Sequence, residues 1–372
     1  MLTDVLKQYS FLRQEQGLHR ERRLHDPCLL NFSSNDYLSL TSNDQIKRAY
    51  QTGFERFPSG SGGSMVVSGY HPAHQALEQS FADALNVDAC LVFSSGYAAN
   101  LSVMSLLARV NAYVLLDKAV HASLYDGIAL SGVQHSRFLH NDLTDLNLKM
   151  QKCPEHTVLM TESLFSMSGQ IAPLAAMVHL AKSRRFEMLV DEAHAFGVLG
   201  REGLGAVIAQ DLTQDDVPLR IIPLGKAFGS CGAIIAGQGV WIDALVQAAR
   251  PYIYSTAMSP ALAYGLMKTL DVVRAADKRR EKLQGLVGYF RERIKQSPLK
   301  WRDSHSPIQQ LQLGCSRRAT DCANFLLEKG IVCLPMRQPT VSLKETGLRV
   351  ILNYQHEVED IDRILLHLGD FT

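Results

Sequence analysis

Short apolar runs alternate with longer amphipathic stretches through the middle of the chain. Runs of strand length lie at residues 89–93, 112–116, 157–161, 188–190, 220–224 and 232–236. Stretches typical of helices lie between them, among them residues 97–108, 121–131 and 174–183. This alternation predicts an α/β fold with a mostly parallel sheet and helices on both of its faces. Functional sites of such sheets lie beyond the carboxyl ends of the strands.

The pattern changes near residue 260. Residues 260–296 form a long helical stretch with many charges, and shorter strands and helices follow it at 308–313, 317–329, 331–335, 348–353 and 357–368. We interpret this part as a smaller α+β domain that a helix connects to the sheet. The predicted division is a helix and a strand in residues 1–45, a large domain in residues 46–270, and a small C-terminal α+β domain in residues 271–372. We expect the first segment to dock on one of the two domains.

Composition and charge exclude several classes of protein. The 372 residues carry 38 Lys and Arg against 37 Asp and Glu, so the net charge of +1 offers no basic face for nucleic acid and no polybasic membrane patch. The long uncharged stretch at residues 89–108 is too polar to span a membrane, and residues 1–23 lack the apolar core of a secretory signal. The seven cysteines are scattered without a C-x-x-C pair, which favours neither disulfides nor a zinc site. We therefore expect a cytoplasmic protein without a bound metal.

Polar residues follow four of the predicted strands. The first group, Ser94-Ser-Gly-Tyr97, leads into a helix whose backbone N–H groups could bind a phosphate, although a plain turn with a serine cap has the same pattern. The second group, Asp191-Glu-Ala-His194, matches the magnesium-binding box of some helicases. That interpretation requires a phosphate loop G-x-x-x-x-G-K-[ST], and the only lysine that directly follows a glycine, Lys226, precedes Ala227. We therefore reject a helicase and keep the other interpretation, a carboxylate that pairs with a cofactor ring nitrogen.

The third group contains Lys226, which lies among small and apolar residues in Leu224-Gly-Lys-Ala-Phe-Gly229. Removal from water disfavours the ammonium ion and lowers its pKa, as a lysine that reacts with an aldehyde requires. An exposed loop lysine is the alternative. The fourth group contains His121, and a histidine after a strand is more often structural than catalytic.

Together the four groups suit one cofactor, pyridoxal phosphate. This cofactor needs an amine for its aldehyde, a carboxylate for its ring nitrogen, a phosphate cradle and a stacking ring. The chain offers these in Lys226, Asp191, Gly96 with Tyr97, and His121. Asp191 would keep the ring nitrogen protonated, which makes the ring an electron acceptor.

Several motifs in order along the chain resemble those of the α-oxoamine synthases, pyridoxal-phosphate enzymes of aminotransferase fold type I. The resemblance covers nearly the whole chain and is carried by Asn31-Phe-Ser-Ser-Asn-Asp-Tyr-Leu38, Gly60-Ser-Gly-Gly-Ser64, Ser68-Gly-Tyr70, His74-Gln-Ala-Leu-Glu78, Asp191-Glu-Ala-His194 and Leu224-Gly-Lys226. It implies a fold type I transferase whose large cofactor-binding domain has a mostly parallel seven-stranded sheet between helices. A smaller α+β C-terminal domain would complete the fold.

Two stretches look most like the family members that join L-alanine to a pimeloyl thioester in biotin biosynthesis. They are Tyr252-Ile-Tyr-Ser-Thr-Ala-Met-Ser-Pro260 and Val67-Ser-Gly-Tyr70, where glycine-using members typically have Gly-Thr instead of Gly-Tyr. The implied reaction is a decarboxylative condensation of L-alanine with pimeloyl-coenzyme A or pimeloyl-acyl carrier protein. Two alternatives stay open: a relative that condenses glycine or serine with another acyl-CoA, and a non-catalytic relative that has lost the cofactor.

The resemblance also implies roles for individual residues. The predicted catalytic residues are Lys226, His121, Asp191 and His194. The predicted cofactor-binding residues are Gly96, Tyr97, His121, Ser166, Asp191, His194, Lys226, Ser255 and Thr256. The predicted substrate-binding residues are Arg20, His121, Thr340 and Arg349.

The resemblance gives the serine–threonine pair and the arginines among these residues a specific chemical role. Ser255 and Thr256 would reach the phosphate bound by the neighbouring subunit, because the family forms homodimers with shared active sites. Arginine binds a carboxylate through two parallel hydrogen bonds, which suits the carboxylate of alanine or of the pimeloyl chain. A solvated surface charge is the alternative for Arg20.

Three residues depart from the family pattern. Pro223 stands where a hydroxyl residue usually binds the cofactor phosphate, and it offers neither O–H nor N–H. Loss of such a charge-assisted hydrogen bond, worth about 1.5–3 kcal/mol, predicts weaker cofactor binding. Met65 replaces the usual arginine after Gly-Gly-Ser, and Ser168 replaces the usual aspartate after Ser-Met. Both changes would remove polar contacts around the site and leave the chemistry of Lys226 in place.

Overall fold

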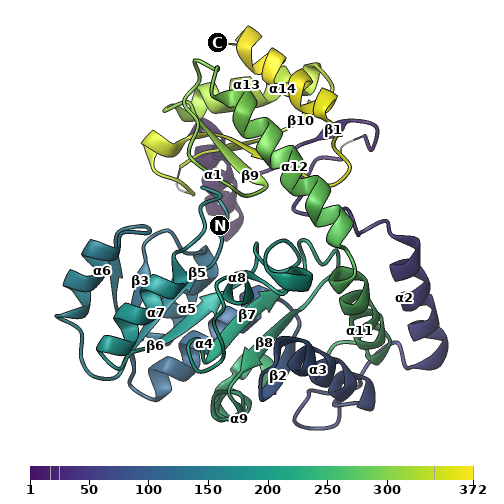
Figure 1. Cartoon of the computed structure of the whole chain (residues 1–372), viewed down its shortest axis with the longest axis vertical. Helices are drawn as coiled ribbons and strands as arrows, with labels where there is room; N and C mark the ends of the chain where they lie inside the picture. The colour runs from purple at the N-terminus through teal and green to yellow at the C-terminus, as the bar shows by residue number, and fades with distance from the viewer. Residues whose placement is uncertain (17, 25, 339, 372) are drawn as a thin grey trace.

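The computed structural model describes residues 1–16, 18–24, 26–338 and 340–371. Figure 1 shows a large lower part built on a sheet and a smaller upper part. The strands of the large sheet are β2 (Ala89–Phe93), β3 (Tyr113–Asp117), β4 (Gln134–Phe138), β5 (Thr157–Glu162), β6 (Glu187–Asp191), β7 (Leu219–Pro223) and β8 (Ala233–Gly237). Their spatial order is β2-β8-β7-β6-β5-β3-β4. The predicted mostly parallel seven-stranded sheet is therefore confirmed.

Strand β8 is antiparallel to both of its neighbours, and the other neighbouring strands of this sheet pair in parallel. The six predicted strands all form, with ends that differ by at most one residue. Strand β4 was not predicted. It lies at the sheet edge, and four of its five side chains are exposed or half-buried, so its sequence lacks the apolar run of a buried strand.

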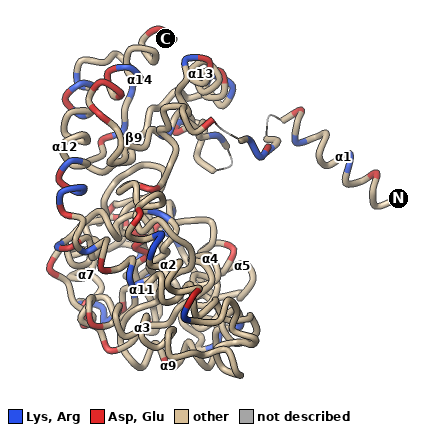
Figure 2. The backbone as a smooth tube through the Cα atoms, turned by 90° about the vertical axis from the view of Figure 1, so that its right-hand side faces the viewer, with Lys and Arg blue, Asp and Glu red and all other residues tan. Residues whose placement is uncertain are grey.

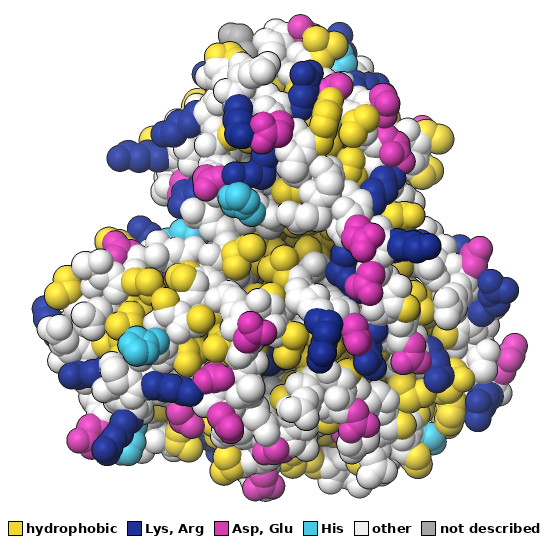
Figure 3. Space-filling view, in the orientation of Figure 1, with side chains coloured by type: hydrophobic (Ala, Val, Ile, Leu, Met, Phe, Trp, Pro, Cys, Tyr) yellow, Lys and Arg dark blue, Asp and Glu magenta, His cyan; other side chains and the backbone are white. Residues whose placement is uncertain are grey.

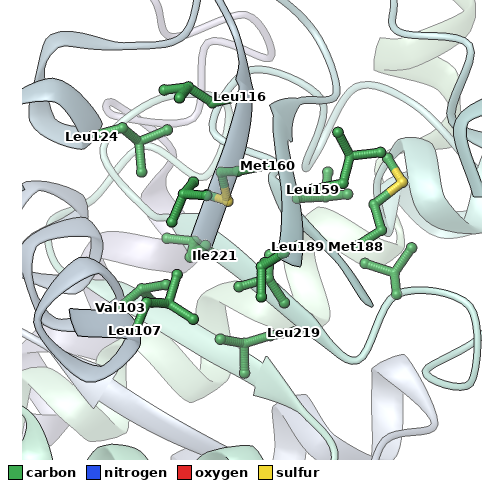
Figure 4. Packing of buried hydrophobic residues seen from close by; sticks show 14 of the residues in the cluster. Val103, Leu107, Leu116, Leu124, Leu159, Met160, Met188, Leu189, Leu219 and Ile221 are labelled. Atoms are coloured by element: carbon green, nitrogen blue, oxygen red, sulfur yellow. The ribbon is translucent and has the colours of Figure 1, made fainter. Parts of the chain in front are cut away.

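Helices cover both faces of this sheet. The helices of this large part are α2 (Asp44–Arg56), α3 (Pro72–Leu85), α4 (Gly96–Arg109), α5 (Ala122–Ser131), α6 (Leu143–Met150), α7 (Leu174–Ser183), α8 (Ala206–Ala209), α9 (Gly239–Ala248), α10 (Arg250–Ile253) and α11 (Pro260–Arg274), of which α2 packs on α11. Alternate residues of one strand enter two separate cores, as in β2, where Leu91 packs in one core and Val92 in the other. Figure 4 shows part of the first core, where Val103 and Leu107 of α4 lie near Leu219 and Ile221 of β7.

The smaller part contains a three-stranded antiparallel sheet of order β11-β12-β9. Its elements are β9 (Ile308–Gln312), α13 (Ser316–Glu328), β10 (Ile331–Val332), β11 (Leu334–Met336), β12 (Gly347–Ile351) and α14 (Val358–Phe371). Two short 3₁₀ turns, Arg201–Gly203 and Leu343–Glu345, lie in the large and small parts. The second core continues from the sheet into this smaller part. The predicted division near residue 270 stays a prediction.

Residues 260–296 form two helices rather than one. Helix α11 ends at Arg274, and α12 (Asp277–Ile294) runs from the lower part into the upper part in Figure 1. Ala275 and Ala276 separate them, and because alanine is the best helix former, the sequence contains no local signal for this break.

The N-terminal segment differs from its prediction. Helix α1 (Leu2–Glu15) buries no residue and projects from the body of the molecule, so the expectation that it docks on a domain is wrong for this chain alone (Figure 2). Strand β1 (Leu30–Asn31) does dock, because it pairs in parallel with β10. Among the described residues no helix is both long and apolar enough to cross a membrane. On the face drawn in Figure 3, charges of both signs are scattered and hydrophobic side chains gather in the recess between the two parts.

Candidate active site

A cavity of about 340 Å³ lies at the carboxyl ends of β2, β5, β6 and β7. These strands run in the same direction, so the polar residues that follow them meet at one edge of the sheet. Six of the predicted site residues line it, namely Gly96, Tyr97, His121, Asp191, His194 and Lys226.

Lys226 lies in a closed loop between β7 and β8. The Leu224 N–H donates to the Gly232 carbonyl at 2.9 Å, and the Ser230 N–H donates back to the Leu224 carbonyl at 3.0 Å. Burial lowers the pKa of Lys226, although Asp191 opposes this change. The loop therefore presents an amine that loses its proton more readily than an exposed lysine, as a reaction with an aldehyde requires.

Asp191 is the last residue of β6 and is 3% exposed. Its Oδ2 accepts a hydrogen bond from Asn100 Nδ2 at 2.9 Å, and its Oδ1 accepts the Ala193 N–H at 2.9 Å. The same Asn100 nitrogen also lies 2.9 Å from Ser123 Oγ. These donors hold the carboxylate in one orientation and stabilise its charge.

Burial keeps both histidines of the cavity neutral. It lowers the pKa of His121, whose Nδ1 lies 2.8 Å from Ser123 Oγ at the start of α5. Burial also lowers the pKa of His194 well below its usual value. The Nδ1 of His194 lies 2.6 Å from the Tyr37 hydroxyl, and burial raises the pKa of Tyr37 to about 12. Tyr37 therefore keeps its proton and links His194 to Asn35, whose Oδ1 accepts from the same hydroxyl at 3.3 Å.

Gly96 and Tyr97 begin α4, a helix of 14 residues, and line the cavity, so the N-terminus of this helix lies at the cavity wall. Ser95 caps this helix, since its Oγ accepts the Ala98 N–H at 3.1 Å. Gly96 lies against the ring of Pro223, and a Cβ at Gly96 would be 2.5 Å from Pro223 Cγ. Only glycine fits at this position while Pro223 stays in place. Pro223 itself lines the cavity at the end of β7.

Three predicted cofactor residues do not line this cavity. Ser166 is buried, and its backbone N–H donates to Glu162 Oε2 at 3.2 Å. Ser255 and Thr256 are exposed and line a small neighbouring pocket that shares Ser94 with the cavity.

The predicted substrate residues lie in two other cavities. Thr340 and Arg349 line one of about 190 Å³, where Nε and Nη2 of Arg349 are buried without a hydrogen-bond partner among the described residues. Arg349 is near enough to oppose the high pKa of Tyr37, so its charge acts on the site of Lys226. Arg20 is exposed and lines a cavity of about 590 Å³, which shares Leu334 with the cavity that Thr340 and Arg349 line.

Several residues of the site were missed from the sequence. Glu162, Asn100 and Ser123 line the cavity, and Tyr37 contacts His194. Two of them had a signal: Glu162 ends a predicted strand as Asp191 does, and Asn100 lies one helical turn after Gly96. Tyr37 had no such signal, because its contact with His194 joins distant parts of the chain.

The other two departures have local explanations. Met65 is half-buried and packs against both cores, so an apolar side chain suits its surroundings. Ser168 is buried, and its Oγ accepts the Gln170 N–H at 3.3 Å and lies 3.5 Å from His140 Nε2.

The donor set fits pyridoxal phosphate. The cavity combines an amine of lowered pKa, a buried carboxylate fixed by two donors, a neutral histidine and the N-terminus of a helix that begins with glycine. These groups match the aldehyde, the ring nitrogen, the ring face and the phosphate of that cofactor.

Comparison with known proteins agrees with this fit. Residues 27–368 match the family described as aminotransferase class I and II. An 8-amino-7-oxononanoate synthase of Pseudomonas syringae pv. tomato is 40% identical over 361 residues, which cover 97% of this chain and 91% of the relative. A solved 8-amino-7-oxononanoate synthase of Francisella tularensis has a TM-score of 0.82 and 30% identity and covers 93% of this chain and 98% of its own.

A more distant solved relative contains the cofactor. It is a serine palmitoyltransferase variant of S. paucimobilis with a bound adduct of pyridoxal phosphate and myriocin. Its TM-score is 0.89 at 26% identity, and the match covers 99% of this chain and 96% of that one.

Proposed function

The chain belongs to the aminotransferase class I and II family, and from this membership we propose that it condenses L-alanine with a pimeloyl thioester. The products are 8-amino-7-oxononanoate, carbon dioxide and the free thiol of the carrier, which is coenzyme A or acyl carrier protein. The observation that carries the proposal is the 40% identity to an 8-amino-7-oxononanoate synthase over 97% of the chain. The cavity around Lys226 and Asp191 supports it.

Five residues would hold pyridoxal phosphate. Lys226 binds its aldehyde, Asp191 pairs with its ring nitrogen and His121 stacks on its ring. The N–H groups of Gly96 and Tyr97 bind its phosphate. When bound, the cofactor supplies an electron-accepting ring that stabilises negative charge at the substrate Cα.

The proton movements fall to Lys226. The amine of Lys226 would remove the proton from the Cα of bound alanine and later return a proton to the product. The lowered pKa of Lys226 suits this task, because a base must be neutral to accept a proton near neutral pH. Asn100 and the Ala193 N–H would hold Asp191 in place against the ring nitrogen.

Arg349 would bind a substrate carboxylate. Two of its nitrogens are buried and unpartnered, and an incoming carboxylate would satisfy both at once. The cavities lined by Arg349 with Thr340 and by Arg20 share part of their wall, and we assign the pimeloyl chain to this connected space. His194, which lines the same cavity as Lys226, would contact the cofactor ring hydroxyl.

We also propose a homodimer with shared active sites in the cytoplasm. Ser64 and Thr256 form a β-bridge, and exposed hydrophobic side chains lie on the two segments around it: Val66, Val67, Tyr70 and Tyr254. A second copy would cover these side chains and the exposed Leu6 and Tyr9 of α1. The seven unpaired cysteines support a reducing compartment. Sedimentation should give twice the mass of one chain.

The test is turnover by the purified protein loaded with pyridoxal phosphate. L-alanine with pimeloyl-coenzyme A should release free thiol and a product with the mass of 8-amino-7-oxononanoate, while glycine and serine should not. The Lys226→Ala variant should lose this activity, and Lys152→Ala, which changes an exposed lysine, should keep it. A thiol released only with glycine or serine would move the chain to a sibling activity, and no thiol with any of the three would refute the proposal.

A further inference from the structure

The cavity contains a second buried carboxyl group, Glu162, which none of the roles above uses. Glu162 is the last residue of β5, and the parallel register pairs it with Asp191, the last residue of β6. Its side chain lines the cavity and is 2% exposed. Oε2 accepts the Ser166 N–H, whereas Oε1 is buried and has no hydrogen-bond partner among the described residues. An ionised carboxylate with one bare oxygen is costly to bury, and a neutral one is much less so.

The groups around Glu162 come from four other elements. Burial and, second, the charge of Asp191 raise the pKa of Glu162 to about 8. The Ser166 N–H, Lys226 and the backbone N–H of His121 act in the opposite direction. Tyr37 is neutral and adds no charge, since its own pKa is about 12. Two carboxyl groups on neighbouring strand ends therefore share one site in which only Asp191 has donors to both oxygens.

We propose that Glu162 is a positioning residue that carries a proton at neutral pH, so that Lys226 faces one carboxylate, Asp191, rather than two. A second negative charge within 4–6 Å would raise the pKa of the lysine by about 1–3 and hold it as ammonium. This inference rests on the proposed function, because that reaction needs the neutral amine of Lys226.

Infrared difference spectroscopy tests the protonation directly. Spectra of wild type minus Glu162→Gln are recorded on the protein with and without pyridoxal phosphate, from about pH 5 to about pH 10. At neutral pH the difference should contain the band of a protonated carboxyl group, which should fade with a midpoint near pH 8. The exposed Glu155→Gln variant is the matched control and should give no such band. Absence of the band at neutral pH would overturn the proposal.

A second measurement reports on Lys226. The absorbance of pyridoxal phosphate bound to the lysine changes as this linkage loses its proton. If the wild-type midpoint lies below pH 8, where Glu162 keeps its proton, Glu162→Gln should leave it within about 0.3, because a neutral amide replaces a neutral acid. A midpoint in that range that falls by about 1 or more would show that Glu162 is an anion there and would refute the proposal. Neither measurement uses alanine or a thioester, so failure of the proposed function would leave both results interpretable.

Discussion

The contact between Gly96 and Pro223 gives a prediction that can be worked out from the structure. Substitution Gly96→Ala places a Cβ 2.5 Å from Cγ and 2.8 Å from Cβ of the proline ring. Carbon atoms that close must move apart, and overpacking of this kind costs about 1–3 kcal/mol. Alanine favours a helix over glycine by up to about 1 kcal/mol, which offsets part of the cost. We expect a net loss of about 1–2 kcal/mol in the free energy of unfolding.

The affinity for pyridoxal phosphate should fall for the same reason. Movement of α4 away from Pro223 displaces the N–H groups of Gly96 and Tyr97, so Gly96→Ala should weaken pyridoxal phosphate binding about tenfold, which corresponds to about 1.4 kcal/mol. Urea unfolding of the cofactor-free protein measures the first effect, and a spectroscopic titration with pyridoxal phosphate measures the second.

A double-mutant cycle isolates the contact. Pro223→Gly removes the two ring atoms that a Cβ at Gly96 would meet. The free energy of unfolding of the double variant should therefore be about 1–3 kcal/mol higher than the value expected from adding the effects of the two single substitutions. Additivity within about 0.5 kcal/mol would refute the argument. Gly285→Ala in α12 is the control, because a Cβ there meets no atom within 4 Å, and it should be neutral or stabilising.

Three further predictions concern the site and the stability of the protein. Asn100→Ala removes a donor from the Asp191 carboxylate, and since hydrogen bonds to charged groups are worth about 1.5–3 kcal/mol, the Kd for pyridoxal phosphate should rise about ten- to a hundredfold in the titration. Pro223→Thr should lower that Kd at least tenfold by adding a hydroxyl, whereas the isosteric Pro223→Val should not; equal effects of the two would refute a phosphate contact. His356 is buried, and burial lowers its pKa to about 4, so between pH 4 and pH 6.5 the histidine is neutral in the folded protein and binds a proton on unfolding. Its contribution to the free energy of unfolding should be complete above pH 6.5 and should fall by about 3 kcal/mol as the pH drops to 4. The His356→Gln variant should not show this loss.

The acid effect on His356 has a local cause that its control can separate from general acid unfolding. Nδ1 of His356 accepts the Asn353 N–H at 3.1 Å, and Nε2 lies 3.1 Å from the Asn31 carbonyl. A proton on Nδ1 would point at another N–H group and break the first hydrogen bond. An equal pH dependence in His356→Gln would show that other groups cause the loss.

Much of the fold followed from the sequence because its central strands are buried on both faces. Such strands are short and almost wholly apolar, as in Ala233–Gly237, whose observed bounds lie one residue from the predicted ones. The polar edge strand Gln134–Phe138 and the break after Arg274 had no comparable signal. The expectation that the helix Leu2–Glu15 docks on a domain was wrong, because apolar side chains indicate that a helix needs a packing partner but not that this partner belongs to the same chain.

The site was predictable to the extent that it follows strand ends. Asp191 ends one buried strand and Lys226 lies three residues after the end of the next, and one rule of topology brings them together. The contacts that orient the side chains of the site and shift their pKa values join distant segments of the chain, as the hydrogen bond between Tyr37 and His194 does. The free oxygen of Glu162 is also of this kind, since hydrogen-bond satisfaction is a property of the packed structure.

The single antiparallel strand of the large sheet has a consequence for the order in which the protein assembles. Strands β7 and β8 are neighbours in sequence and can pair early, with the Lys226 loop between them. Strand β2 joins the sheet only through β8, which lies far along the chain, so its closure carries a high entropic cost and is slow. Because Gly96 follows β2, the phosphate cradle is completed at this late step. We expect pyridoxal phosphate to be captured only by chains whose large sheet has closed, which makes cofactor uptake a reporter of complete folding during synthesis.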